Sequence, residues 1–300
     1  MYFMNSQKNA SLRRLRPRTF TIVLMCMLLL TLIISACGGN SSTTSNDQLT
    51  KVTPNVPAPK DLQTADTLTI GTDPTYFPME YVDQTSNQYT GFDIDLSQAL
   101  AAHMGVKVNV VKTSFDTIFD DLNNKRFDII VASVYMSPAR LPKFDFVKYM
   151  QAGSALLVQN GNPKNVKGVD DLCGLNVSVQ NGTSQQEKLT ATSKACEAKG
   201  KSAIKVMVLG TETDVIQALV DRRVDATFQG SLSAGYYNKL HPEQFAYGGP
   251  VIEAAPSGIV IRKGDVEMQN AVQKAFQALK ADGTYDKLFT KWGFTNDEKI

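Results

Sequence analysis

Two kinds of apolar pattern alternate along residues 68–292 of this chain. Short runs rich in Val and Ile predict buried strands, and longer stretches with helical spacing of apolar residues predict helices. The predicted strands are residues 68–71, 106–111, 129–132, 176–179, 205–208 and 225–228. The predicted helices are residues 96–104, 115–123, 184–196, 213–221, 265–282 and 285–292. Strands that alternate with helices predict an α/β fold with largely parallel sheets.

Residues 128–140 combine a predicted strand with candidate chemistry. The apolar start turns polar towards Pro138, where a helix is expected to begin with Ser137 as its N-cap. Arg140 follows one turn later, so its guanidinium can reach back to the strand end. A carboxylate there would meet a bidentate cation, free N–H groups and the positive end of a helix, at the edge where open α/β sheets bind ligands. The alternative is a surface arginine that caps its own helix, and this stretch alone does not decide between them.

The N-terminal segment has the pattern of an export signal. Five cations without an acidic residue precede an apolar run over residues 20–34 that is too short for a good membrane span. The cations are Lys8, Arg13, Arg14, Arg16 and Arg18. Small residues then lead to Cys37, which resembles a bacterial lipoprotein signal: residues 1–36 would be removed and Cys37 would carry a lipid. A secretory signal with an incidental Cys37, an uncleaved anchor and twin-arginine export are the alternatives.

Residues 37–65 have the composition of a tether. Ser, Thr, Asn, Gln and Pro dominate, so the stretch lacks the apolar content to repay ordering. We expect it to hold the folded body off the outer face of the cytoplasmic membrane. No stretch after Ile34 is predicted to span a membrane.

Charge argues against a nucleic-acid partner. The chain has 31 basic and 29 acidic residues, and removal of the five signal cations leaves 26 basic residues. No basic stripe with interleaved aromatic residues is present, so we expect no nucleic-acid binding.

Five motifs resemble one known family. They are Gly71-Thr72-Asp73-Pro74-Thr75-Tyr76-Phe77-Pro78-Met79-Glu80, Gly91-Phe92-Asp93-Ile94-Asp95-Leu96, residues 128–140, Asp145-Phe146 and Asp282-Gly283-Thr284-Tyr285-Asp286-Lys287-Leu288. Each motif is weak alone. In this order and spacing they are similar to the polar amino-acid family, family 3, of bacterial extracellular solute-binding proteins, over about residues 68–294.

The resemblance implies a two-lobed α/β clamshell, the type II periplasmic-binding-protein fold, with two crossings between the lobes. By analogy, lobe 1 is residues 66–152 plus 256–300, and lobe 2 is residues 153–255. Such proteins feed ABC importers, so the expected partners are a small carboxylate or amino-acid ligand and a membrane permease. We expect a monomer that needs no cofactor and is not an enzyme. Ligand contacts from both lobes would favour the closed form.

The resemblance also implies a grip on the ligand α-carboxylate. Arg140 would clamp this group, assisted by the backbone near Ser133. Thr183 and Ser184, at the start of a predicted helix, would add hydroxyl and N–H groups.

Three further residues are expected to meet the rest of the ligand. Tyr76 would stack on it, and Asp73 stands where the family commonly reads the ligand side chain. Phe115 would line the side-chain pocket. Plain core packing is the alternative for Phe115, because it shares a helical apolar face with Ile118 and Phe119.

Two positions depart from the family pattern. Tyr135 stands where a Ser or Thr is usual, and Gly230 where an Asp usually pairs with the ligand α-ammonium. A buried ammonium without a counter-charge is costly, so either another carboxylate replaces that Asp or the ligand has no free α-amine. The candidates are Asp73, Glu212 and Asp214. Tyr135 would offer a π face to a cation or fill space.

Cys173 and Cys196 are predicted to form a disulfide within lobe 2, because an exported protein meets an oxidising environment. The bridge would close a loop of about 22 residues, worth roughly 3 kcal/mol. A metal or redox pair is the alternative. The pair lacks CxxC spacing and the chain has only 2 histidines, so we expect no metal site.

Two other classes of function remain open. The same clamshell hosts dehydratases of carboxylated rings, for which Asp73 or Glu212 with a shifted pKa would have to act as acid or base. A ligand-sensing receptor subunit would need a separate signalling partner.

Overall fold

The computed structural model describes residues 52–300, so the predicted signal peptide, Cys37 and the first part of the tether lie outside the described residues. The end of the predicted tether packs against the body. The N–H groups of Asn55 and Val56 both donate to the His103 carbonyl at 3.0 Å, and the Val56 side chain joins a hydrophobic core. Residues 55 and 56 therefore belong to the folded body and not to the predicted tether, because the body offers them a carbonyl group and an apolar surface.

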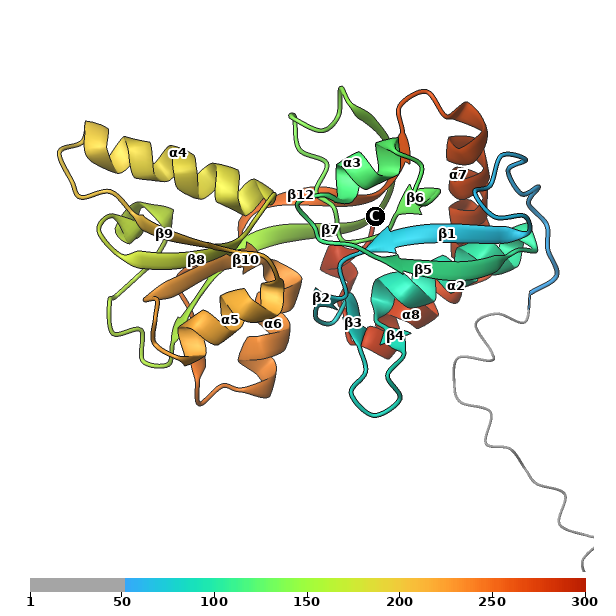
Figure 1. The fold of residues 1–300 in the computed structure, drawn as a ribbon. Coiled ribbons are helices and arrows are strands. Elements are labelled where there is room, and N and C mark those ends of the chain that lie inside the picture. Colours follow the sequence, from blue (N-terminus) through green and yellow to red (C-terminus); the bar gives the residue numbers. More distant parts are fainter. Residues whose placement is uncertain (1–51) are drawn as a thin grey trace, which may run out of the picture. The chain divides into compact units, whose positions relative to one another are not determined.

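One mixed sheet of nine strands organises the described residues (Figure 1). In order across the sheet, its strands are β5 (Lys107–Lys112), β1 (Thr67–Thr72), β6 (Ile129–Ile130), β12 (Ile252–Arg262), β7 (Phe144–Gln159), β10 (Ala226–Gly230), β8 (Asn176–Gln180) and β9 (Lys205–Leu209), with β11 (Phe245–Tyr247) paired to β7. Parallel pairs connect β5, β1 and β6 on one flank and β10, β8 and β9 on the other. A second sheet holds β2 (Thr75–Tyr76), β3 (Glu80–Val82) and β4 (Tyr89–Thr90).

An antiparallel ribbon of β7 and β12 joins the two parallel flanks. Its register runs from Ile252 opposite Ser154 to Arg262 opposite Phe144. At its sides β12 pairs with β6 and β7 pairs with β10. The sequence pattern did not predict these two strands. Gly153 interrupts the apolar pattern of the first of them, as glycine in a strand often does.

Helices cover both flanks. They are α2 (Phe92–Met104), α3 (Ile118–Asn123), α4 (Ser184–Ala198), α5 (Glu212–Val220), α6 (Ser231–Leu240), α7 (Val266–Ala281) and α8 (Thr284–Trp292), with 3-10 turns η2 (Val169–Leu172) and η3 (Asn296–Glu298). Within residues 52–300, none of the helices has the length and apolar content needed to cross a bilayer.

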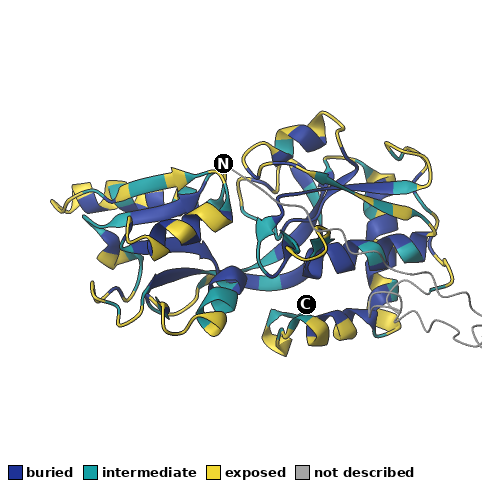
Figure 2. Cartoon of the chain, turned by 60° about the horizontal axis from the view of Figure 1, so that its bottom comes forward, coloured by how far each residue is buried: buried dark blue, intermediate teal, exposed yellow. Residues whose placement is uncertain are grey.

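Separate hydrophobic cores lie under the two flanks. One core contains Leu68 of β1 together with Val272 of α7, and another contains Val177 of β8 together with Leu189 of α4. Figure 2 shows the same division, with buried strands next to helices whose outer faces are exposed. The predicted two-lobed α/β fold is confirmed, while the exact lobe limits stay a prediction.

Two helices begin three or four residues away from their predicted starts. α2 begins at Phe92 instead of residue 96. Its N-cap, Gly91, has a φ of 132° that glycine adopts readily, and Asp93 and Asp95 in the first turn favour a helix start here. α3 begins at Ile118 instead of residue 115, because the preceding residues form a turn.

The predicted helix at Pro138 is absent, and residues 138–143 form turns instead. The N–H groups of Arg140 and Leu141 both donate to the Ser137 carbonyl, at 2.9 and 3.2 Å. Pro142 then stops the helix, because it has no N–H to donate and disfavours helical geometry in the residue before it. The predicted contribution of a helix that begins at Pro138 is therefore wrong.

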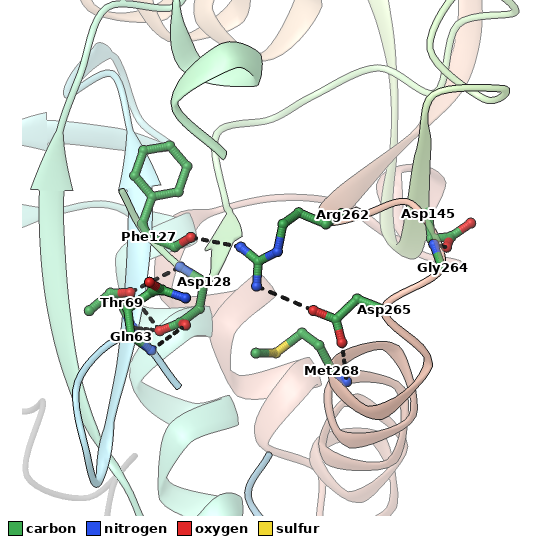
Figure 3. Close-up of polar contacts among 9 residues, drawn as sticks. All are labelled: Gln63, Thr69, Phe127, Asp128, Asp145, Arg262, Gly264, Asp265 and Met268. Atoms are coloured by element: carbon green, nitrogen blue, oxygen red, sulfur yellow. Dashed lines mark hydrogen bonds and ion pairs between the residues drawn. The ribbon is translucent and has the colours of Figure 1, made fainter. Parts of the chain in front are cut away.

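Asp128 holds the start of β6 against β1 (Figure 3). Its Oδ2 accepts hydrogen bonds from the Thr69 N–H at 2.7 Å and the Thr69 hydroxyl at 2.5 Å. Nearby, Arg262 at the end of β12 donates to the Phe127 carbonyl at 3.0 Å and to Asp265 at 3.2 Å. These contacts fix the strand from which residues 131–140 lead into the site described below.

The predicted disulfide between Cys173 and Cys196 is present. It links the residue after η2 to α4, and Cys196 is part of the hydrophobic core that contains Val177.

Candidate ligand-binding site

One pocket collects side chains from both flanks of the sheet. All nine residues that the sequence analysis proposed for ligand binding line it: Asp73, Tyr76, Phe115, Ser133, Tyr135, Arg140, Thr183, Ser184 and Gly230. The lining also contains Glu212, a candidate partner of the ligand ammonium, and six residues that were not proposed for the site: Glu80, Ala132, Gln180, Gln185, Phe228 and Gln229. Within residues 52–300, no group of three His, Cys, Asp or Glu side chains is placed to hold a metal ion.

Arg140 is a buried cation in this pocket, with 8% of its surface exposed. Its Nη1 donates to the Tyr135 carbonyl and its Nη2 to the Gly182 carbonyl, both at 3.1 Å. The guanidinium carbon lies 4.8 Å from the ring centre of Phe119 and 5.7 Å from that of Phe115. Burial lowers the pKa of Arg140 to about 10, so the group remains charged at neutral pH.

No carboxylate lies within ion-pair distance of Arg140 among residues 52–300. Carbonyl oxygens and aromatic faces solvate a guanidinium only in part, and a buried charge without a partner is costly. An anion in the pocket would remove that cost. The same contacts show that Phe115 both packs in the core and faces the pocket, so the two alternatives for it hold together.

Thr183 and Ser184 begin α4 beside Arg140. The Thr183 hydroxyl accepts from the Gln186 N–H at 3.2 Å and donates to the Gln180 carbonyl at 2.7 Å. Gly182 has a φ of +75°, and a Cβ there would lie 2.8 Å from the Asp116 Cα. The tight turn therefore brings the N-terminus of a 15-residue helix to the pocket.

Asp73 links the two sides of the pocket. Its Oδ2 accepts from Gln180 Nε2 at 2.7 Å and its Oδ1 from the Thr75 hydroxyl at 3.1 Å. Burial nevertheless raises its pKa above the ordinary value of 3.8. Gln180 ends a parallel strand, and its position at the carboxyl end of β8 is the signal that could have identified it from the sequence.

Glu80 and Asp93 form a buried pair of carboxyl groups. Burial raises the pKa of Glu80 well above its ordinary value, and the charge of Asp93 adds to the shift. Burial also raises the pKa of Asp93 to about 6, although Asp93 accepts from the Ser133 N–H and the Tyr149 hydroxyl, both at 2.8 Å. Two carboxylates in one buried site cannot both ionise, so Glu80 is the protonated member.

Tyr76 and Gly230 fit closely together. A Cβ on Gly230 would lie 1.7 Å from the Tyr76 hydroxyl oxygen, so no side chain fits at position 230 while Tyr76 keeps its place. Tyr135 donates its hydroxyl to the Gly153 carbonyl, which ties it to β7. These contacts explain why glycine occupies position 230.

Glu212 begins α5 after its N-cap, Thr211, and has 2% of its surface exposed. Its Oε1 accepts from the Ser233 hydroxyl at 3.1 Å. Burial raises the pKa of Glu212 to about 8. Asp214, the other sequence candidate on this helix, is exposed and does not line the pocket.

The comparisons with known proteins agree with this geometry. The family model for bacterial extracellular solute-binding proteins, family 3, matches residues 68–296. The L-cystine-binding protein TcyJ of Escherichia coli (strain K12) is 30% identical over 227 residues, which cover 75% of this chain and 82% of that protein.

Two solved structures are similar over most of the described body. An ancestral arginine-binding protein bound to arginine has a TM-score of 0.70 and 32% identity, over 76% of this chain and 98% of that one. The ancestral amino acid-binding protein AncCDT-1, a precursor of cyclohexadienyl dehydratase, has a TM-score of 0.68 and 36% identity, over 76% of this chain and 95% of that one. The predicted family is confirmed, and this chain belongs to the bacterial extracellular solute-binding proteins, family 3.

Proposed function

We propose that this protein captures a small solute with a carboxylate, an amino acid or an amino-acid derivative, and delivers it to the permease of an ABC importer. The observation that carries the proposal is Arg140, a buried guanidinium that faces the pocket without an acidic partner among residues 52–300. A carboxylate would supply the missing charge and accept two parallel hydrogen bonds from it. The similar proteins agree in kind, since their names give cystine, arginine or amino acids as what they bind.

The other pocket residues would divide the ligand between them. The N–H groups of Thr183 and Ser184 and the Ser184 hydroxyl would add donors to the carboxylate, while the Thr183 hydroxyl donates to the Gln180 carbonyl. Tyr76 and Phe115 would pack on the remainder of the solute. Asp73 would act by holding the pocket together, because protein donors already occupy both of its oxygens.

We expect the two lobes to close around the bound solute. Several hydrogen bonds already cross between residues assigned by analogy to different lobes, among them Gln180 to Asp73 at 2.7 Å, Asn181 to Asp116 at 3.1 Å and Arg140 to the Gly182 carbonyl at 3.1 Å. A ligand held by both lobes would add to these contacts only in the closed form, and so shift the population towards it.

We also propose that the exported protein is a monomer anchored to the outer face of the cytoplasmic membrane through a lipid on Cys37. The support is the signal pattern in residues 1–37, which lies outside the described residues. Fractionation of cells that produce the Cys37→Ala variant tests the anchor. Release of this variant from membranes is expected, and its retention would contradict the anchor without affecting the proposed ligand.

A thermal-shift screen of the full chain in detergent tests the proposed solute. The panel holds the common amino acids, cystine, N-methylated and betaine-like derivatives, and amine-free carboxylates. A ligand at 100 times its Kd should stabilise the protein by about 2.7 kcal/mol. For a body of this size that corresponds to a Tm increase of about 5–11 °C. A panel in which no carboxylate raises the Tm would contradict the proposal.

A dehydratase of carboxylated rings is the second candidate function. Glu212 favours it, because a buried carboxyl group with a pKa of about 8 can deliver a proton to a leaving hydroxyl group. This chain is also similar to AncCDT-1, an amino acid-binding protein described as a precursor of cyclohexadienyl dehydratase. Mass spectrometry of ligand recovered after incubation separates the two functions, since capture returns the solute unchanged and dehydration removes one water.

A further inference from the structure

Glu212 is an acidic residue of the pocket with free hydrogen-bonding capacity. Its carboxyl group has a single hydrogen-bond partner in the described chain, the Ser233 hydroxyl. Both oxygens of Asp73 accept from protein donors, and Glu80 is opposed by a second carboxyl group. Asp214 is exposed and lies outside the pocket. Glu80 Oε2 also has no partner in the described chain, but ionisation of Glu80 would place a second buried negative charge beside Asp93. Among Asp73, Glu80, Glu212 and Asp214, Glu212 is therefore the one placed to meet a ligand cation.

Glu212 also lies beside the position from which no side chain can act. Ser233, its partner, belongs to the first turn of α6, which starts directly after Gly230. The Tyr76 hydroxyl excludes any Cβ at Gly230. A negative charge in this part of the pocket must therefore come from a neighbouring element, and the start of α5 supplies it.

Arg140 and Glu212 line the same pocket and form no ion pair with each other or with another residue in the described part of the chain. A buried guanidinium and a buried carboxyl group that stay apart fit a ligand with two opposite charges of its own. We propose that Glu212 pairs with the ammonium group of the solute while Arg140 holds its carboxylate. The solute would then be a zwitterion with a free amine, an assignment that rests on the proposed function.

The proposed pairing should change the protonation of Glu212, and this change can be measured. The titratable groups that interact with it are Asp73, Tyr76, Glu80, Tyr135 and Tyr237. None is a cation, and burial keeps the carboxyl group largely protonated at pH 7. An ammonium favours the ionised form, so zwitterion binding at pH 7 should expel a proton. A solute without a cation would leave the proton in place.

The test compares matched solutes in the full chain and its Glu212→Gln variant. The pairs are L-arginine with 5-guanidinopentanoate, L-glutamine with 4-carbamoylbutanoate, and L-leucine with 4-methylpentanoate, which differ only in the α-amine. Calorimetric titration in two buffers of different ionisation enthalpy gives both the Kd and the number of protons released. We expect the wild type to bind at least one amino acid 10- to 100-fold more tightly than its amine-free partner, with proton release. The variant should lose both this preference and the proton release.

Asp214→Asn is the matched control, because it removes an exposed carboxylate from the same helix. It should keep the preference and the proton release of the wild type. A Glu212→Gln variant that keeps the preference for the amine would overturn the assignment and leave the proposed function intact. A wild type that prefers the amine-free partners would overturn it as well. A wild type that binds neither member of any pair would overturn the assignment for these solutes, and the wider thermal-shift panel would then decide on the proposed function.

Discussion

Arg140 and Arg126 follow one another closely in the chain but are held in different ways. Arg126 is 52% exposed and donates to Asp121 at 2.6 Å, so its charge is paired within the protein. Arg140 is 8% exposed and meets only carbonyl oxygens and aromatic rings. The charge of Arg126 is neutralised by the protein itself, whereas the buried charge of Arg140 can be neutralised by a ligand. Glu212 resembles Arg140 in lacking a charged partner, although burial keeps its carboxyl group largely protonated until a cation binds.

Removal of Arg140 should have the largest effect. The Arg140→Ala variant should bind the solute more weakly by about 3–5 kcal/mol, or more than 100-fold, because the ligand carboxylate would be buried without a counter-charge. Arg126→Ala is the control and should change the Kd less than about twofold, since exposed ion pairs contribute little. Calorimetric titration measures both. An Arg140→Ala variant with unchanged affinity would remove Arg140 from the site.

A Cβ at position 230 should have the next largest effect. In Gly230→Ala the new atom would overlap the Tyr76 hydroxyl and displace its ring into the pocket. We expect a loss of about 1–3 kcal/mol in binding, roughly 10- to 100-fold. Gly210→Ala is the control, because nothing lies within 4 Å of a Cβ there. Adding Tyr76→Phe to Gly230→Ala should recover part of the affinity, and no recovery would argue against this steric coupling.

The pH dependence of affinity separates the two charged groups of the pocket. Glu212 has a pKa of about 8 without a ligand, and Arg140 one of about 10. Below pH 8 an ammonium must displace the Glu212 proton. As the pH rises from about 6 to about 8, the Kd should therefore fall by up to about tenfold per pH unit, and above pH 8 it should level off. Arg140 stays charged throughout this window and contributes no slope. An affinity that falls as the pH rises through 8 would mean that protonated Glu212 donates to a neutral group.

The disulfide should have the smallest effect on binding. Neither Cys173 nor Cys196 lines the pocket, although the bridge closes a separation of 23 residues. Replacement of both by Ser should lower the free energy of unfolding by about 3 kcal/mol and change the Kd less than about twofold. Urea unfolding and calorimetric titration measure the two quantities. A large change in Kd would show that the lobe 2 core is coupled to the pocket.

Much of this architecture could be predicted from the sequence. Patterns of apolar residues identified the parallel strands and most helices, because burial on one face leaves a periodic trace. The long strands β7 and β12 were not predicted, because their residues alternate irregularly between buried and exposed positions. The helix expected at Pro138 failed for a local reason that the sequence already contained, namely Pro142.

The sequence by itself determined the family, the disulfide and the nine residues that meet in one pocket, because motif order and residue type carry that information. Only the tertiary structure decided which of three candidate carboxylates is free. The sequence does not distinguish Asp73, Glu212 and Asp214 as carboxylates. In the structure they differ in burial and in the hydrogen-bond donors that neighbouring elements bring to them. Those donors come from residues up to 107 positions away, and their approach depends on how the sheet brings its strand ends together.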